Sequence, residues 1–195
     1  MNTLMLGATM ALLLHITPTV VLLKLEDAVK RILPTATDFT AREVHLSGAD
    51  AHKLHDALDW GPDDGVLTFY TGRAAGTPVG ALTFVRVETQ HGPIDIAVGF
   101  DLNGAVTRVE MTKATVETKP WMLEALRSGV LDRYAGVKPG LESDLHRVAN
   151  VPAMPGGADS YRGKVGRMAG YMLEQVDKAV VRAIVAYAWF YRPSA

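Results

Sequence analysis

Hydrophobic and polar positions alternate with two periods along the chain, and the first period is that of a helix. The residues spaced as on one face of a helix are Leu25, Ala28, Val29, Ile32 and Leu33. Pro34 ends this run, so we predict a short amphipathic helix there. Ser47, a residue type that caps helix N-termini, predicts a second short helix that ends near Asp59–Trp60–Gly61–Pro62. Its apolar face consists of Leu54, Ala57 and Leu58.

The period then changes to that of strands. Four segments have the β-rich composition or the alternation of strands, namely Val66–Thr71, Pro78–Val87, Ile94–Phe100 and Ala105–Met111. Asn103–Gly104, in the last turn, supplies the positive φ that a tight hairpin requires. We therefore predict a meander of four antiparallel strands. In Ile94–Phe100 one face is strongly apolar and the other is small, so we expect close packing over the small face.

The pattern of the remaining residues predicts two helices separated by a long loop. Trp121–Val130 has a helical pattern, whereas Pro139 to Gly170 is rich in glycine and proline and predicts a long loop of the functional or mobile kind. Met168 through Tyr191 predicts a C-terminal helix that packs on the core. Its aromatic end, Ala188–Tyr191, also suits a membrane interface or a partner. The predicted fold class is α+β, a small antiparallel sheet flanked by helices.

The N-terminal stretch differs from the rest of the chain. No charged residue occurs from Thr3 to Leu23, a length close to the roughly 20 residues that a helix needs to cross a bilayer. We therefore predict a transmembrane or signal-anchor helix over residues 1–23 and one domain over residues 24–195. No Ala-x-Ala cleavage pattern follows, which favours an uncleaved anchor. Lys24, Lys30 and Arg31 weakly place the side after the span in the cytoplasm.

Composition excludes several classes of function. The 195 residues are 48% hydrophobic and 21% charged with a net charge of −1, which allows a packed core and gives no broad electrostatic case for nucleic acid. The chain has no cysteine, so thiolate catalysis and iron–sulfur ligation are excluded. The common hydrolase, zinc-protease and nucleotide-binding motifs are absent, and we predict no catalytic residue. His52 and His55 offer two ligands without a third, so no metal site is predicted.

The order of the segments after His91 carries a resemblance. A Gly-containing strand, Ile94–Phe100, is followed by Asp101–Leu102–Asn103–Gly104, a further strand from Ala105, and then Glu117–Thr118–Lys119–Pro120. This order resembles the FMN-binding domain family, found in the flavin-carrying subunits of the sodium-pumping NADH:quinone oxidoreductase and of the Rnf electron-transport complex. The resemblance covers roughly Leu25 to Trp121, and the C-terminal helix by position.

The resemblance implies a periplasmic, extracytoplasmic domain that is tethered by one N-terminal helix, holds FMN and passes electrons. Such a protein is an electron carrier or complex subunit more than a stand-alone enzyme. Covalent members of the family carry FMN on the threonine of a Ser/Thr-Gly-Ala-Thr motif before the last helix. This chain has Gly157–Ala158–Asp159 in that region and no threonine, so we expect FMN, if present, to be held non-covalently.

The expected flavin site combines residues from three regions. Glu117 and Thr118 match the family's Glu-Thr pair, which lies near the flavin. Ser160, Arg162 and Lys164 offer donors to a phosphate from the glycine-rich loop. The flat isoalloxazine ring needs a wall of small residues and an apolar cover. The expected small wall is Gly80, Ala97 and Gly99, and the expected cover is Trp121, Met122, Tyr161 and Tyr171.

The sequence also supports a different class of function. The same fold without flavin would serve as a structural or accessory subunit of a membrane redox or photosynthetic-type complex. The missing threonine and the apolar termini favour this alternative, because termini that dock on other subunits tend to be apolar. In both cases the expected partners are other subunits of a membrane electron-transfer complex and the lipid bilayer, and not nucleic acid.

Overall fold

Six antiparallel strands form one sheet in the computed structural model, which describes residues 17–138 and 166–191. Their order across the sheet is β1-β6-β5-β4-β3-β2. The strands are β1 (Thr19–Val21), β2 (Asp38–His45), β3 (Val66–Ala74), β4 (Thr77–Val87), β5 (Ile94–Phe100) and β6 (Val106–Thr115). The predicted α+β class and the four-stranded meander, β3 to β6, are confirmed. The sheet has one additional strand at each edge.

The first strand corrects the predicted membrane helix. Thr19–Val21 pairs with Thr115, Ala114 and Lys113 of β6, and the backbone N–H groups of Leu22 and Leu23 both donate to the carbonyl of Thr112. The expectation that one helix runs through residue 23 is therefore wrong, because β-branched residues after Pro18 extend the sheet instead. Residues 1–16, the greater part of the predicted span, lie outside the described residues. Within residues 17–138 and 166–191 every helix falls short of the length or apolarity that crossing a bilayer demands.

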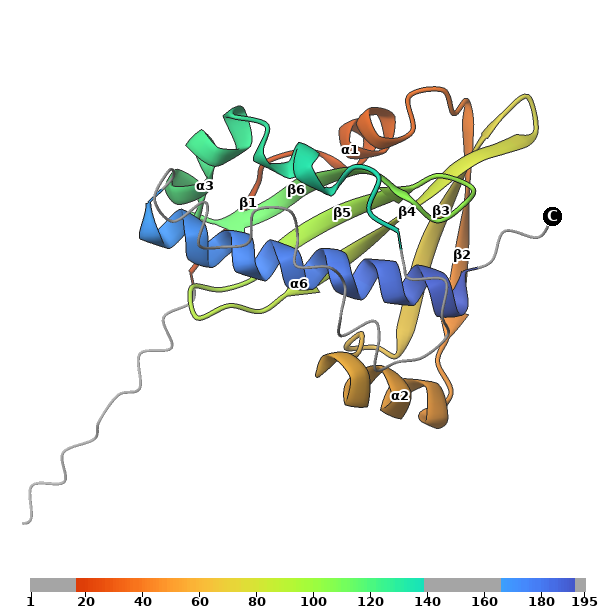
Figure 1. Ribbon diagram of the computed structural model, residues 1–195, viewed down its shortest axis with the longest axis horizontal. Coiled ribbons are helices and arrows are strands. Elements are labelled where there is room, and N and C mark those ends of the chain that lie inside the picture. The colour runs from red at the N-terminus through yellow and green to blue at the C-terminus, as the bar shows by residue number, and fades with distance from the viewer. Residues whose placement is uncertain (1–16, 139–165, 192–195) are drawn as a thin grey trace, which may run out of the picture.

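Helices cover both faces and one end of the sheet, as Figure 1 shows. They are α1 (Leu25–Ile32), α2 (Gly48–Leu58), α3 (Lys119–Arg127), the 3-10 turn η1 (Val130–Tyr134) and α6 (Arg167–Phe190). Each of the four helices predicted after residue 24 is confirmed, with shifts of up to three residues at its ends. Ser47 caps α2 as predicted, since its hydroxyl accepts from the N–H of Asp50 and the Asp50 carboxylate accepts from the N–H of Ser47. Most of the predicted loop, residues 139–165, lies outside the described residues, and its last residues, from Arg167, belong to α6 instead.

The larger core lies between α6 and the sheet. Ile94, Ile96 and Val98 of β5 point toward α6, whose buried residues include Met172, Val176 and Ile184. The predicted core-packing role of the C-terminal helix is confirmed. Its aromatic end is also docked, since Tyr191 is 4% exposed and its ring lies 4.9 Å from that of Phe69.

The opposite face of β5 is covered by α1. An ideal Cβ on Gly99 would lie 2.0 Å from Cγ2 of Ile32, and one on Gly80 would lie 2.8 Å from Cδ2 of Leu33. Ala28, Val29, Ile32 and Leu33 form a second buried cluster with Leu82 and Ala97. The predicted close packing over the small face is confirmed, and the element that packs there is α1.

The β5–β6 turn differs in detail from the predicted tight hairpin. Residues 101–105 separate the strands, and Oδ1 of Asp101 accepts from the N–H groups of Asn103 and Ala105 at 2.8 Å each. Gly104 has φ +80°, whereas Asn103 does not adopt a positive φ. The side chain of Asp101 and a single glycine therefore replace the Asn-Gly pair as the source of the turn.

A buried polar contact joins η1 to α6. The hydroxyl of Tyr134 donates to Oδ1 of Asp177 at 2.6 Å, and the guanidinium of Arg133 donates to both of these residues. Burial, together with the nearby Asp177 carboxylate, raises the pKa of Tyr134 well above its usual value. The neutral phenol is thereby kept as a donor that ties η1 to α6.

The packing of α1 predicts that β5 does not tolerate a side chain at position 99. Gly99→Ala places a methyl group against Ile32, so we expect a loss of about 1–3 kcal/mol in the free energy of unfolding, measured by urea denaturation. The matched control is Gly48→Ala, whose Cβ meets nothing within 4 Å, and we expect a change within about 0.5 kcal/mol there. Equal effects of the two substitutions would contradict this packing.

The burial of Tyr187 predicts an alkaline limit to stability. Its hydroxyl donates to the carbonyl of Asp101 at 3.2 Å, and burial raises its pKa from 10.0 to about 12. The unfolded chain loses this proton first, so the stability is complete below pH 10 and falls between pH 10 and about 12. Tyr187→Phe should flatten this fall in urea titrations. Tyr70→Phe, on the opposite face of the sheet, is the control, and equal flattening in both variants would rule out Tyr187 as the cause.

Candidate functional site

The turn between β4 and β5 is held in one conformation by its own polar groups. The hydroxyl of Thr89 donates to the carbonyl of Gly92 at 2.7 Å and accepts from the N–H of His91 at 3.0 Å. Gly92 has φ +87°, and a Cβ there would lie 2.7 Å from Cγ2 of Thr115. The turn therefore requires glycine at this position, and it fixes where the His91 side chain begins.

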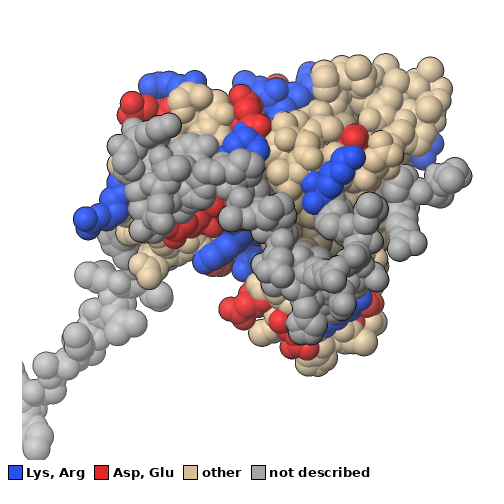
Figure 2. Space-filling model, in the orientation of Figure 1, with Lys and Arg blue, Asp and Glu red and all other residues tan. Residues whose placement is uncertain are grey.

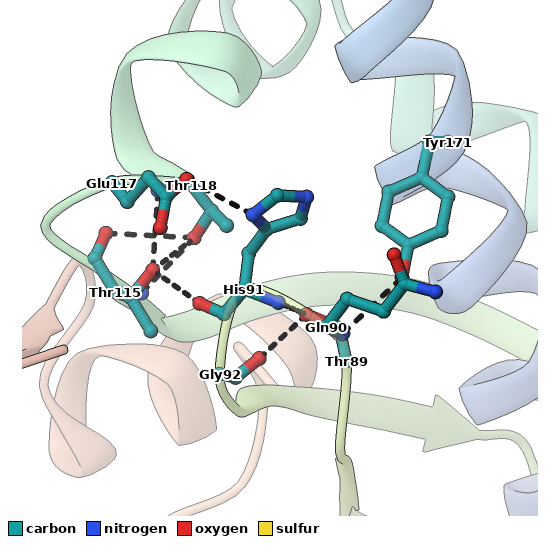
Figure 3. A network of polar contacts seen from close by, with 8 residues as sticks. All are labelled: Thr89, Gln90, His91, Gly92, Thr115, Glu117, Thr118 and Tyr171. Carbon is teal, nitrogen blue, oxygen red and sulfur yellow. Dashed lines mark hydrogen bonds and ion pairs between the residues drawn. The ribbon is translucent and has the colours of Figure 1, made fainter. Parts of the chain in front are cut away.

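Two buried threonines connect this turn to the start of α3. The hydroxyl of Thr115 donates to the carbonyl of His91 at 3.0 Å, so in its 2.9 Å contact with the Thr118 hydroxyl it must accept. The N–H of Thr115 donates to the hydroxyl of Thr118, and the N–H of Thr118 donates to the hydroxyl of Thr115. Both threonines are fully buried. Their hydroxyls form a clamp that sets the β4–β5 turn against α3, as Figure 3 shows.

The ring of His91 stands out from this clamp and meets three side chains. Nδ1 of His91 lies 2.9 Å from Oε1 of Glu117. The rings of Trp121 and Tyr171 meet it nearly edge-on, with centroids 4.8 Å and 5.9 Å away. We call these four residues, His91, Glu117, Trp121 and Tyr171, the His91 cluster. Nε2 of His91 makes no hydrogen bond to any residue that the structure describes, and the His91 side chain is 27% exposed.

Two helices begin at the His91 cluster. Trp121 is in the first turn of α3, and Tyr171 follows the first turn of α6. Neither helix has a side-chain cap or an acidic residue in its first turn. The N-terminal N–H groups of a helix attract negative charge, so this end of the molecule suits a ligand that combines an aromatic ring with an anionic group.

Comparison of the chain with protein-family models and with curated proteins finds no match. The resemblance to the FMN-binding domain family therefore stays a prediction that is carried by the motifs of this sequence. Of those motifs, Glu117–Thr118 is part of the His91 cluster and its supporting clamp.

The structure brings together four of the residues that the sequence singled out. Glu117, Trp121 and Tyr171 lie in the cluster, and Thr118 lies directly below it. The Thr118 hydroxyl faces Thr115 and is fully buried, so it supports the site instead of facing a ligand. Met122, also expected as cover, is fully buried in the main core.

The expected flavin wall, Gly80, Ala97 and Gly99, lies away from the His91 cluster. These residues lie on the α1 face of the sheet, where Ile32 and Leu33 fill the space in front of the glycines. A flat ring has no room there, because the contact distances already require glycine. The small residues serve helix packing, and the His91 cluster is built elsewhere.

The expected phosphate donors Ser160, Arg162 and Lys164, and the expected cover residue Tyr161, lie outside the described residues. The stretch that contains them joins the described part of the chain at Gly166, the residue before α6. Among the residues that the structure describes, no three His, Asp or Glu side chains group as metal ligands.

The sequence analysis assigned no role to His91. In the structure His91 lies just before β5 and Glu117 just after β6, and the pairing of Asp95 with Lys113 brings these two segments side by side. The pairing of β5 with β6 shifts register twice, at Asp95/Ile96 and at Gly99/Phe100. The position of the turn alone therefore does not predict the contact between His91 and Glu117.

The threonine clamp predicts a specific loss on substitution. Thr118→Val leaves the buried N–H of Thr115 without its acceptor, so we expect a loss of about 1–3 kcal/mol in the free energy of unfolding, measured by urea denaturation. Thr118→Ser keeps the hydroxyl and should retain most of the stability. Thr40→Val, at an exposed position on β2, is the control for the change of residue type, and a similar loss there would count against the clamp.

Proposed function

We propose that this protein is a membrane-anchored electron-transfer subunit that binds FMN non-covalently at the His91 cluster. One observation carries the proposal: aromatic rings from three separate segments, with one uncommitted ring nitrogen, meet where two uncapped helices begin. Flavin sites need apolar cover, a few donors at the polar ring edge and a place for the phosphate. The cluster offers each of these.

The residues of the cluster have different parts in this proposal. Trp121 and Tyr171 supply flat apolar surface for the ring system. Glu117 orients the His91 ring through Nδ1, which leaves Nε2 for a polar atom of the ligand. The first N–H groups of α6 suit the phosphate, together with Ser160, Arg162 and Lys164 from the preceding stretch.

FMN would supply the redox chemistry, since its isoalloxazine ring accepts and releases electrons one or two at a time. The protein then needs only to bind and orient the group, and to hold it near the surface for an electron donor and acceptor. The cluster fits this modest demand, because its one His–Glu pair can bind and orient a polar atom of the ring system.

The proposal is tested first on protein purified in detergent. We expect flavin absorption bands whose colour stays in the supernatant after acid precipitation, as a non-covalent cofactor does. Titration of FMN into flavin-free protein, followed by flavin fluorescence, should give saturable binding. His91→Ala should weaken it by about tenfold, a cost near 1.4 kcal/mol. The control is His45→Ala, a histidine on β2 whose side chain is 77% exposed and lies 3.8 Å from the carboxylate of Glu43.

A folded protein that neither carries nor takes up FMN would contradict this function. That outcome would favour the alternative, a flavin-free accessory subunit of a membrane complex. The filled space at Gly80 and Gly99 supports the alternative, since α1 occupies the surface on which the sequence had suggested a flavin wall. Binding that is lost equally in His91→Ala and His45→Ala would place FMN outside the His91 cluster.

A further inference from the structure

A groove with a volume of about 520 Å³ lies between α1, β1 and α3. Part of its lining is aliphatic and comes from Val21, Leu22 and Leu23 at the sheet edge and from Leu123 and Leu126 of α3. Val21 is 58% exposed, so its side chain is open to a ligand in the groove. This volume is in the range of small-ligand sites. We call it the β1 groove.

The charge around the β1 groove is unbalanced. Four cations line it, namely Arg31, Arg108, Lys119 and Arg127, against two acids, Glu110 and Asp132. Arg31 and Arg108 share Glu110, at 3.9 Å and 2.7 Å. Neither Lys119 nor Arg127 forms an ion pair within residues 17–138 and 166–191. In Figure 2, Lys and Arg side chains lie along the edge where α3 and α1 lie, with Asp and Glu side chains between them.

The chain itself indicates what lies near the groove. Residue 16 ends the stretch outside the structure, and most of that stretch belongs to the uncharged run from Thr3 to Leu23. At about 3.4 Å per residue, residue 16 is no more than about 17 Å from Val21. A bilayer that holds the part of this run before residue 17 therefore lies within reach of the groove.

We propose that the β1 groove binds an anionic phospholipid of the bilayer surface. Lys119 and Arg127 attract the phosphate headgroup, and the leucines beside them contact the upper part of an acyl chain. A free phosphate ion would use the cations but not the aliphatic walls. The inference rests on the proposed membrane anchoring and not on FMN, because the groove shares no residue with the His91 cluster.

The experiment uses the full chain in lipid vesicles. Because the chain has no cysteine, Val21→Cys gives a unique site for an environment-sensitive fluorophore in the groove, and His55→Cys gives a distant one on α2. Phosphatidylglycerol or phosphatidylcholine with brominated acyl chains is added at equal mole fraction. We expect phosphatidylglycerol to quench the label at position 21 more strongly than phosphatidylcholine, and the label at position 55 to be unaffected by either.

Charge-reversal variants then distinguish a specific phospholipid site from mere nearness of the β1 groove to the bilayer. Lys119→Glu and Arg127→Glu should each lower the preference for phosphatidylglycerol by more than about fivefold, since loss of one cation near an anionic surface costs about 1 kcal/mol and the new carboxylate adds repulsion. Lys53→Glu, an exposed lysine on α2 that carries the same change of charge, should keep the preference. The neutral variants Lys119→Gln and Arg127→Gln should lower the preference for phosphatidylglycerol less than the reversals do. They also serve as controls for misfolding caused by the new negative charge.

Three outcomes would overturn the proposal. Equal quenching by the two lipids would show nearness to the bilayer without an anionic site. A preference that survives both reversals would place the site elsewhere. Absence of quenching by either lipid would leave the groove to a protein partner. FMN titration of the same samples is read separately, so a failure of the lipid site does not alter the result for the flavin.

Discussion

Strand β5 is buried on both faces, and each face fits a different helix. Toward α6 it presents Ile94, Ile96 and Val98, whose large side chains fill the main core. Toward α1 it presents Ala97 and Gly99, whose small size lets the helix pack directly against the strand. The separation between α1 and the sheet is set by the missing side chain at Gly99. The layers of the fold, α1, sheet and α6, are therefore held in register by the alternation of one strand.

This alternation explains how much of the fold was predictable. Strands β3 to β6 each bury at least one face, so their composition and turns showed in the sequence. Strand β2 is exposed along almost its whole length and lacks an apolar face. Strand β1 was assigned to a membrane helix, because an uncharged apolar run suits a helix as well as a sheet edge. Its pairing with β6 is non-local, and local patterns do not report such contacts.

The candidate site was predictable only in part, for a related reason. Glu117, Trp121 and Tyr171 were recognised as single residues, yet their meeting point is defined by His91, which the pattern left isolated. Gly80 and Gly99 were placed at the flavin because a small residue indicates close approach without saying of what. Thr118 was expected to face the ligand, whereas burial and its reciprocal bonds with Thr115 direct it inward.

The pairing of β1 has a consequence for how the chain is made. Thr19 pairs with Thr115, which the ribosome adds 96 residues later. At about 5–20 residues per second, β1 waits roughly 5–20 s for its partner strand. Throughout that interval the N-terminal segment has no β6 to pair with. The order of synthesis therefore makes β1, the first strand along the chain, unable to join the sheet until the last strand has been made.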